Sequence, residues 1–268
     1  MNSTERNKLN VTAKLTLAVT ILCLFATSAL AQDPVKVLPQ AYKLVFENDW
    51  VKVTRVHYAP KEKLPAHQHT QTASAYVYLN DSGPVVFKHI GLEYGAITRP
   101  ATKAGSFRLY RGLQEIHEVE NLSDLPSDFL RVEFKTQPVN DKTLRGRFFR
   151  EEYPQGENFQ KVQFENEQVR ITRLVCAAGK KLDVSTSATE PALLIALSPS
   201  KFKVHETKDK RATLKLEMGQ HSWIEAGQQK GFENTGTAPA EMLRFDLKTN
   251  PLSKEMLEKD KKHEHPKN

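Results

Sequence analysis

The sequence predicts an all-β protein made of two tandem small β-barrels, and two observations lead to this prediction. The chain contains a long internal repeat, in which residues 44–56 (LVFENDWVKVTRV) align with residues 162–174 (VQFENEQVRITRL) at a constant offset of 118, with six of thirteen positions identical. Each copy is also divided into short segments rich in Val, Tyr and Phe, which is typical of strands. Neither copy keeps a helical periodicity over three turns.

The length and composition agree with a globular protein of this kind. A chain of 268 residues is long enough for one large or two small domains. Apolar residues make up 39% and charged residues 26%, with 12 Gly and 14 Pro, which excludes collagen-like, low-complexity and wholly disordered chains. Two Cys cannot form a disulfide framework, so we expect no internal disulfide.

The repeat divides the chain into units. The two copies match again near their ends, where residues 130–136 correspond to residues 243–249 at an offset of 113. Repeats of this length indicate an internal duplication of one domain instead of a solenoid of short repeats. The predicted divisions are a first unit at 41–137, a connecting segment at 138–157, a second unit at 158–250 and a charged tail at 251–268.

Short strands account for most of the first unit. Turn residues such as the Asn-Asp-Ser-Gly-Pro cluster at 80–84 separate them. Strands at this spacing either close into a barrel or pack as two sheets, because an open sheet would leave unpaired edges. The segments predicted as strands are 51–58, 74–79, 84–90, 106–111 and 129–135.

The N-terminal segment 1–31 has the pattern of an export signal. Three basic residues precede an apolar run at 15–30, which ends in the small-residue pattern Ala-Leu-Ala, so we predict cleavage after Ala31 and a periplasmic or secreted protein. An uncleaved membrane anchor is the alternative, although the run is shorter than a typical span. After cleavage we expect no membrane contact. The net charge of +7 comes from scattered Lys and Arg, so we expect no nucleic-acid partner.

Three histidines form the one constellation that points to chemistry. His67 and His69 are two residues apart and would share one face of a strand, and His117 lies on a separate β segment. Three neutral imidazoles suit one divalent transition metal, Zn, Fe, Ni, Cu or Mn, better than Mg or Ca. The alternative is that each is an ordinary surface or core histidine. A carboxylate ligand is left open among Glu93, Glu115, Glu118 and Glu120.

These motifs resemble those of the cupin superfamily, and especially exported bacterial bicupins. The family has Gly, five residues, His-x-His, three or four residues and Glu in its first motif, and Pro-x-Gly-x-x-His-x-x-x-Asn in its second. The resemblance implies a double-stranded β-helix fold with His67, His69 and His117 as ligands of one metal. In this chain Lys61 replaces the Gly and no Glu follows at the expected place.

The second unit serves as an internal comparison. At the constant offsets, the positions that match the three histidines hold Ser185, Ser187 and Lys230. Two hydroxyls and a cation make a poor metal site. We therefore expect one metal ion per chain, in the first unit.

We therefore expect this protein to bind a small molecule beside a divalent metal in its first unit. We expect Tyr76, Tyr78 and Phe87 to line the ligand cavity. The alternative is a metal-dependent cupin enzyme of the dioxygenase, isomerase or hydrolase type, which would need a titratable group near the metal. The predicted partner is a small-molecule ligand, and a homodimer is left open.

Overall fold

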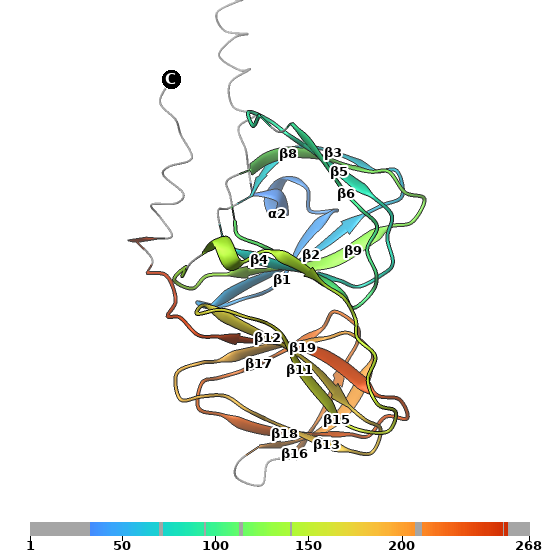
Figure 1. Ribbon diagram of the computed structural model, residues 1–268, viewed down its shortest axis with the longest axis vertical. Helices are drawn as coiled ribbons and strands as arrows, with labels where there is room; N and C mark the ends of the chain where they lie inside the picture. Colours follow the sequence, from blue (N-terminus) through green and yellow to red (C-terminus); the bar gives the residue numbers. More distant parts are fainter. Residues whose placement is uncertain are drawn as a thin grey trace, which may run out of the picture.

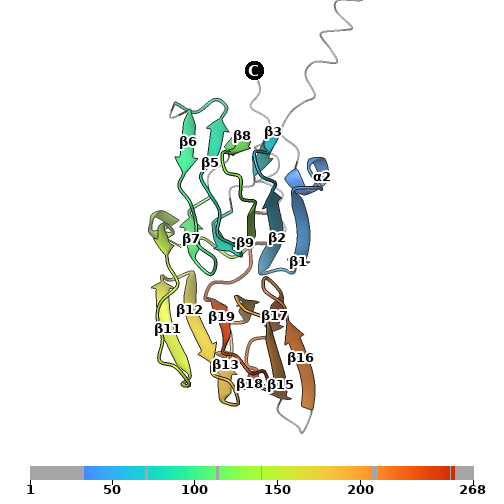
Figure 2. The same ribbon diagram turned by 90° about the vertical axis from the view of Figure 1, so that its right-hand side faces the viewer.

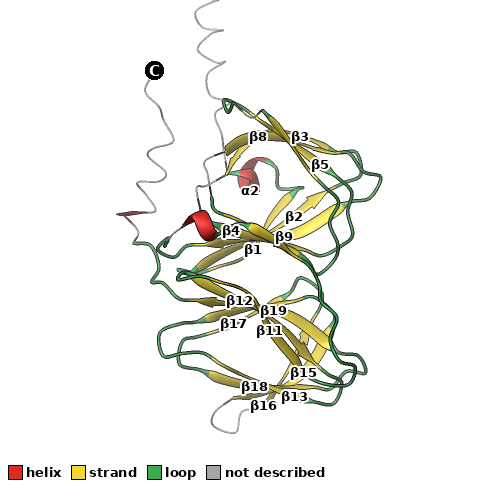
Figure 3. Cartoon of the chain, viewed as in Figure 1, coloured by secondary structure: helices red, strands yellow, loops and turns green. Residues whose placement is uncertain are grey.

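The computed structural model describes residues 33–69, 72–93, 95–112, 115–139, 141–206, 211–253 and 255–256. The predicted export signal and most of the charged tail lie outside these residues. The described chain is nearly all β, which confirms the predicted class, and its helices are short, such as α2 (Pro34–Val37) and the 3₁₀ turn η1 (Asp141–Thr143) (Figure 3). No helix in the described part is long and apolar enough to cross a membrane.

The first half of the chain forms two sheets. Its strands are β1 (Tyr42–Glu47), β2 (Val51–Tyr58), β3 (Lys63–His69), β4 (Ser74–Tyr78), β5 (Val85–His89), β6 (Ala96–Arg99), β7 (Phe107–Tyr110), β8 (Glu115–Asn121), β9 (Ser127–Phe134) and β10 (Gly146–Phe148). The larger sheet has the order β1-β2-β9-β4-β7-β10, and the smaller has the order β3-β8-β5-β6.

The second half repeats this plan. Its strands are β11 (Phe159–Glu165), β12 (Val169–Cys176), β13 (Lys181–Ser185), β14 (Ala192–Ala196), β15 (Ser200–Glu206), β16 (Arg211–Leu216), β17 (His221–Ile224), β18 (Gln229–Asn234) and β19 (Ala240–Leu247). The orders are β11-β12-β19-β14-β17 and β13-β18-β15-β16. They are the orders of the first half without an equivalent of β10.

Strand β10 is not predicted by the sequence, which indicates only a connecting segment there. It pairs with β7 because Phe148 stacks on Phe107, with ring centroids 4.6 Å apart and planes at 12°. A short connection therefore becomes the edge of the first large sheet.

The four sheets stack along the long axis of the molecule, with the two larger sheets in the middle (Figures 1 and 2). Apolar side chains from both halves fill the space between these inner sheets, including Val53, Leu130, Ile171 and Phe245, each fully buried. Each inner sheet is thus covered on both faces. This explains why every residue of β4 and β14 is buried.

The residues repeated in both halves build matching turns. The side-chain oxygen of Asn48 accepts hydrogen bonds from two backbone N–H groups at the start of β2, and Asn166 does the same at β12. Lys135 and Lys248 each bind the carboxylate and the carbonyl of the corresponding Glu-Asn pair. These residues serve the fold, since the half without the histidines keeps them.

Candidate metal centre

A β-bulge in β3 brings the histidines into the interior of the first unit. Leu64 pairs with Val119 and His67 pairs with His117, so β3 contains one residue more than β8 between these pairs. The bulge contains Pro65, which lacks the N–H that a regular ladder would need. Because of the extra residue, His67 is fully buried while Ala66 is exposed.

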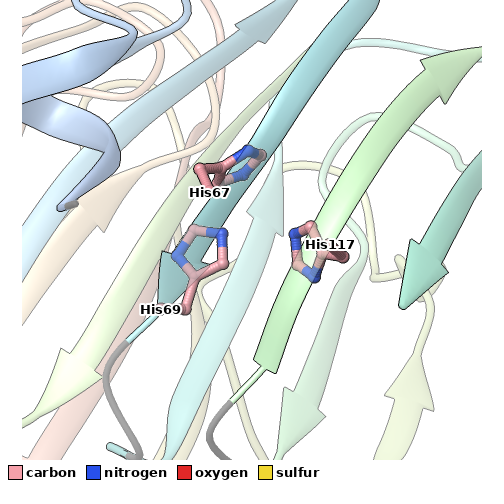
Figure 4. A group of neighbouring side chains, drawn as sticks. All are labelled: His67, His69 and His117. Carbon is pink, nitrogen blue, oxygen red and sulfur yellow. The ribbon is translucent and has the colours of Figure 1, made fainter. Parts of the chain in front are cut away.

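The three imidazoles converge from two neighbouring strands. Ring centroids of His67, His69 and His117 are 4.9 to 5.0 Å apart. Their ligand nitrogens all lie within 4.8 Å of one another. Figure 4 shows the rings turned toward a common point. The structure therefore brings together the three residues that the sequence analysis selected, in an arrangement that one ion can bridge.

The hydrogen bonds of these rings show which nitrogens could bind a metal ion. Nδ1 of His67 donates to the carbonyl of Pro65 at 2.9 Å, which leaves Nε2 as an acceptor, 2.8 Å from the hydroxyl of Tyr42. Nδ1 of His69 accepts from the guanidinium of Arg131. Nε2 of His117 is buried and has no hydrogen-bond partner among the described residues. A buried orphan nitrogen is costly unless something binds it.

Burial keeps the imidazoles neutral. It lowers the pKa of His117 to about 4, and it lowers the pKa of His67 and His69 below the usual range, where the nearby Arg131 cation adds to the effect. A metal binds the neutral form of imidazole, so this donor set fits a transition metal at neutral pH.

The lowered pKa of His117 predicts that the metal-free protein loses stability as the pH falls from about 6.5 to about 4. In this window the unfolded chain binds a proton on the imidazole and the folded chain does not, so acid favours unfolding. The shift corresponds to roughly 3 kcal/mol of unfolding free energy as an upper limit. Urea denaturation of metal-free protein across this pH range measures the loss.

The matched variants for this measurement are His117→Gln and His57→Gln. The first removes one of the three titrating imidazoles and should make the pH profile less steep, whereas His57 is exposed on β2 and its replacement should leave the slope unchanged. An unaltered profile in His117→Gln would show that this imidazole is not the source of the acid sensitivity.

Glu115 is the carboxylate that the structure selects from the four left open. It lies two residues before His117 on the same face of β8, and its Oε2 is 3.5 Å from Nδ1 of that ring and 3.4 Å from Nε2 of His89. Tyr110 donates a hydrogen bond to its other oxygen. Because side chains two residues apart on a strand share a face, the sequence alone could have singled out Glu115 as the carboxylate beside His117.

Comparison with known proteins identifies the fold. No family model and no curated protein sequence matches this chain. The structure is similar to YhaK from Escherichia coli (TM-score 0.53, 15% identity, 79% of this chain and 92% of that one) and to vicilin from Capsicum annuum (0.53, 11%, 75% and 76%). It is also similar to a salicylate 1,2-dioxygenase from Pseudoaminobacter salicylatoxidans (0.50, 12%, 74% and 71%). The chain has a bicupin fold.

The described residues of the second unit form no such centre. The constant offset in the sequence matches His67 with Ser185, but the strand pairing gives a different match. His67 pairs with His117 in the first unit, and Lys230, the counterpart of His117, pairs with Val184 in the second. The structural counterpart of His67 is therefore Val184. The bulge in β3 has no counterpart in β13, so the match is wrong by one residue. Val184 belongs to an apolar core, and both groups of described side chains that could hold a metal ion lie in the first unit.

The first cupin unit contains two adjoining cavities. The inner one reaches His69 and His117 and is lined by Tyr76 and Phe87, and the outer one is lined by Tyr78 and again Phe87. The predicted ligand-binding residues therefore face these cavities, while the binding itself remains a prediction. Sequence reasoning missed Tyr42, Tyr58, Arg99 and Arg131, which line the same space and belong to no motif.

Proposed function

We propose that this bicupin holds one divalent transition metal on His67, His69 and His117, and that the centre binds a small molecule in the first unit. The observation that carries the proposal is the buried Nε2 of His117, which finds no hydrogen-bond partner in the described part of the chain and faces two further imidazoles. The metal, one of Zn, Fe, Ni, Cu or Mn, would act as a Lewis acid on a ligand atom.

The side chains around the centre support binding in a fixed orientation. The carbonyl of Pro65 holds His67 with Nε2 toward the site, and the carboxylate of Glu115 lies behind His117. Carboxylates in that position orient ligating imidazoles. A metal ion on Nε2 of His67 would release the phenol of Tyr42, which could then donate its hydrogen bond to a bound ligand.

Elemental analysis tests the proposal. Protein purified from the exported fraction without metal-affinity columns should contain about one transition-metal ion per chain. Protein that contains none, and takes up none of the five candidate metals, would contradict it.

An enzyme is the second candidate, and Tyr42 is the observation that favours it. Its hydroxyl lies 2.8 Å from Nε2 of His67, and burial raises the pKa of Tyr42 well above its usual value, so at neutral pH it stays a neutral phenol that can donate a hydrogen bond to a reacting oxygen. One neighbour in the cupin fold is named as a salicylate 1,2-dioxygenase. Small molecules extracted from the purified protein are identified by mass spectrometry and incubated with metal-loaded protein. Conversion of such a molecule, slowed in Tyr42→Phe, would favour the enzyme, and its recovery unchanged would favour the binding protein.

We also propose that the protein is exported with cleavage after Ala31 and that its two halves arose by duplication. The charged and apolar N-terminal pattern supports the first statement. The equal strand orders and the matching turns support the second. Mass spectrometry of the exported protein should find Gln32 as the first residue.

A further inference from the structure

A second group of side chains lies on the side of His117 that faces away from His67. Strand pairing places His67, His117 and His89 in one row across β3, β8 and β5, and Glu115 stands two residues before His117. Oε2 of Glu115 lies 3.4 Å from Nε2 of His89 and 3.5 Å from Nδ1 of His117. All three side chains are at least nine-tenths buried. Together they form an interior group of one carboxylate and two imidazoles.

The hydrogen bond of His89 brings two acceptor atoms face to face. Nδ1 of His89 lies 3.1 Å from the carbonyl of Gly95, and a carbonyl only accepts, so Nδ1 carries the proton of the neutral ring and Nε2 carries a lone pair. That lone pair faces the carboxylate of Glu115. Among the described residues, the ion pairs of Glu115 involve histidines alone. A buried carboxylate is costly without a cation, so this contact needs a second proton on His89 or a metal ion.

Both ring nitrogens of His117 are buried, and neither has a hydrogen-bond partner among the described residues. The ion proposed above takes Nε2, and Nδ1 is the nitrogen near Glu115. An imidazole that gives up its N–H proton has a lone pair on each nitrogen, so it can bind one ion on each side. His117 therefore stands between two groups of ligands, with one nitrogen for each.

The distances within the second group match those of a metal site. Ligand atoms held about 2.0 to 2.2 Å from a tetrahedral zinc ion stand roughly 3.3 to 3.6 Å apart. The two contacts of Oε2 of Glu115 are 3.4 and 3.5 Å long, and the three ligand atoms all lie within 4.8 Å of one another. The carbonyl of Gly95 orients His89, and the phenol of Tyr110 donates to the other oxygen of Glu115. Such contacts hold ligands in place before the ion arrives.

The second unit shows that the fold does not require this group. Strand pairing there places Glu206 opposite Lys230, the counterpart of His117. Gln228 stands two residues before Lys230, at the position of the carboxylate. A lysine in the central position repels a metal ion. The group of one carboxylate and two imidazoles is thus specific to the unit that contains the first centre.

We propose that His89, Glu115 and Nδ1 of His117 hold a second divalent transition-metal ion, so that the imidazolate of His117 bridges two ions. The second ion replaces the Nδ1 proton, which passes to the buffer. It binds more weakly than the first, because it displaces that proton and lies near another dication, so it enters only when metal is in excess. The bridge rests on the proposed function, whereas the second group of ligands rests on its own contacts.

Equilibrium dialysis of metal-free protein against increasing Zn²⁺ tests the inference. The parent chain should take up a first ion at low Zn²⁺ and a second at higher Zn²⁺, whereas His89→Gln and Glu115→Gln should each stop after the first. The control is His205→Gln, because His205 also lies 3.2 Å from a carboxylate, that of Glu233, but belongs to neither group of three described ligands. This control should take up both ions. Circular dichroism checks the fold of each variant.

Copper(II) reports the bridge through its electron spin. Two Cu²⁺ ions joined by one imidazolate couple their spins, so the electron paramagnetic resonance signal should rise as the first ion binds and fall as the second enters. In His89→Gln the signal should stay at its one-ion value. A second ion that binds without lowering the signal would overturn the bridge.

The outcomes also separate this inference from the proposed function. A single ion that His89→Gln loses, and that remains when Ser replaces both His67 and His69, would support the second group and contradict the first centre. A single ion that His89→Gln keeps, and that the two serine substitutions remove, would overturn the inference alone. Equal uptake by the parent chain and His89→Gln at high Zn²⁺ would overturn it as well, since ions on surface groups are common to both proteins.

Discussion

Protein with Ser in place of both His67 and His69 is expected to bind no divalent metal, whereas the parent chain is expected to bind about one ion. The substitution leaves His117 as the one imidazole of the three, and serine hydroxyls are weak neutral ligands beside it. Because His89, Glu115 and His117 form a second group that could hold an ion, the variant also carries His89→Gln. The fold should persist, because strand β13 of the second unit forms the corresponding part of a sheet without histidines.

Elemental analysis after dialysis against trace metal gives the readout, and circular dichroism checks the fold. The matched control replaces His57 and His205 with Ser, since these histidines lie outside the cluster on β2 and β15. The control should keep its metal. Retention of one ion by the variant at His67, His69 and His89 would refute the assigned ligands.

Glu241→Ala is expected to lower the free energy of unfolding by about 3 to 5 kcal/mol. The carboxylate of Glu241 pairs with Arg173, whose side chain is fully buried, and its other oxygen lies 2.7 Å from Arg150. The same Arg173 donates to the carbonyl of Gly105 in the first unit at 2.7 Å. Without the carboxylate, a buried cation at the junction of the two halves has lost its counter-ion.

Urea denaturation measures this loss, with Glu165→Ala as the control. Glu165 also pairs with two cations, Arg170 and Lys248, but the group is exposed to solvent, so its removal should cost about 0 to 1 kcal/mol. Similar losses of unfolding free energy in the two variants would show that burial does not increase the contribution of the ion pair at Glu241.

The repeat and the strand segments could be predicted because they depend on local composition and alternation. Strand β10 and the bulge in β3 could not, since both depend on which strands pair. The segment that contains Phe148 becomes a strand because Phe148 stacks on Phe107 of β7. The residues around Phe148 in the sequence do not indicate this distant partner.

Some residues of the candidate site could likewise be predicted from the sequence, and others could not. His67, His69 and His117 could be predicted from spacing, and Glu115 could be located by alternation from His117. Arg99 could not, because it lies on a strand that meets the histidine strands only through β5. Its place in the cavity walls depends on packing between sheets, which leaves no pattern in the nearby sequence.

The core shared by the two inner sheets makes the halves of this chain inseparable as modules. The sheet that carries Tyr76 and Arg131 toward the cavity has Val53, Leu130 and Val132 on its other face, and these pack against the second unit. An isolated first unit would expose that face to water and would tend to aggregate. The second half therefore shields the apolar face of the half that contains the candidate metal centre, and transfer of that centre to another protein would require both halves.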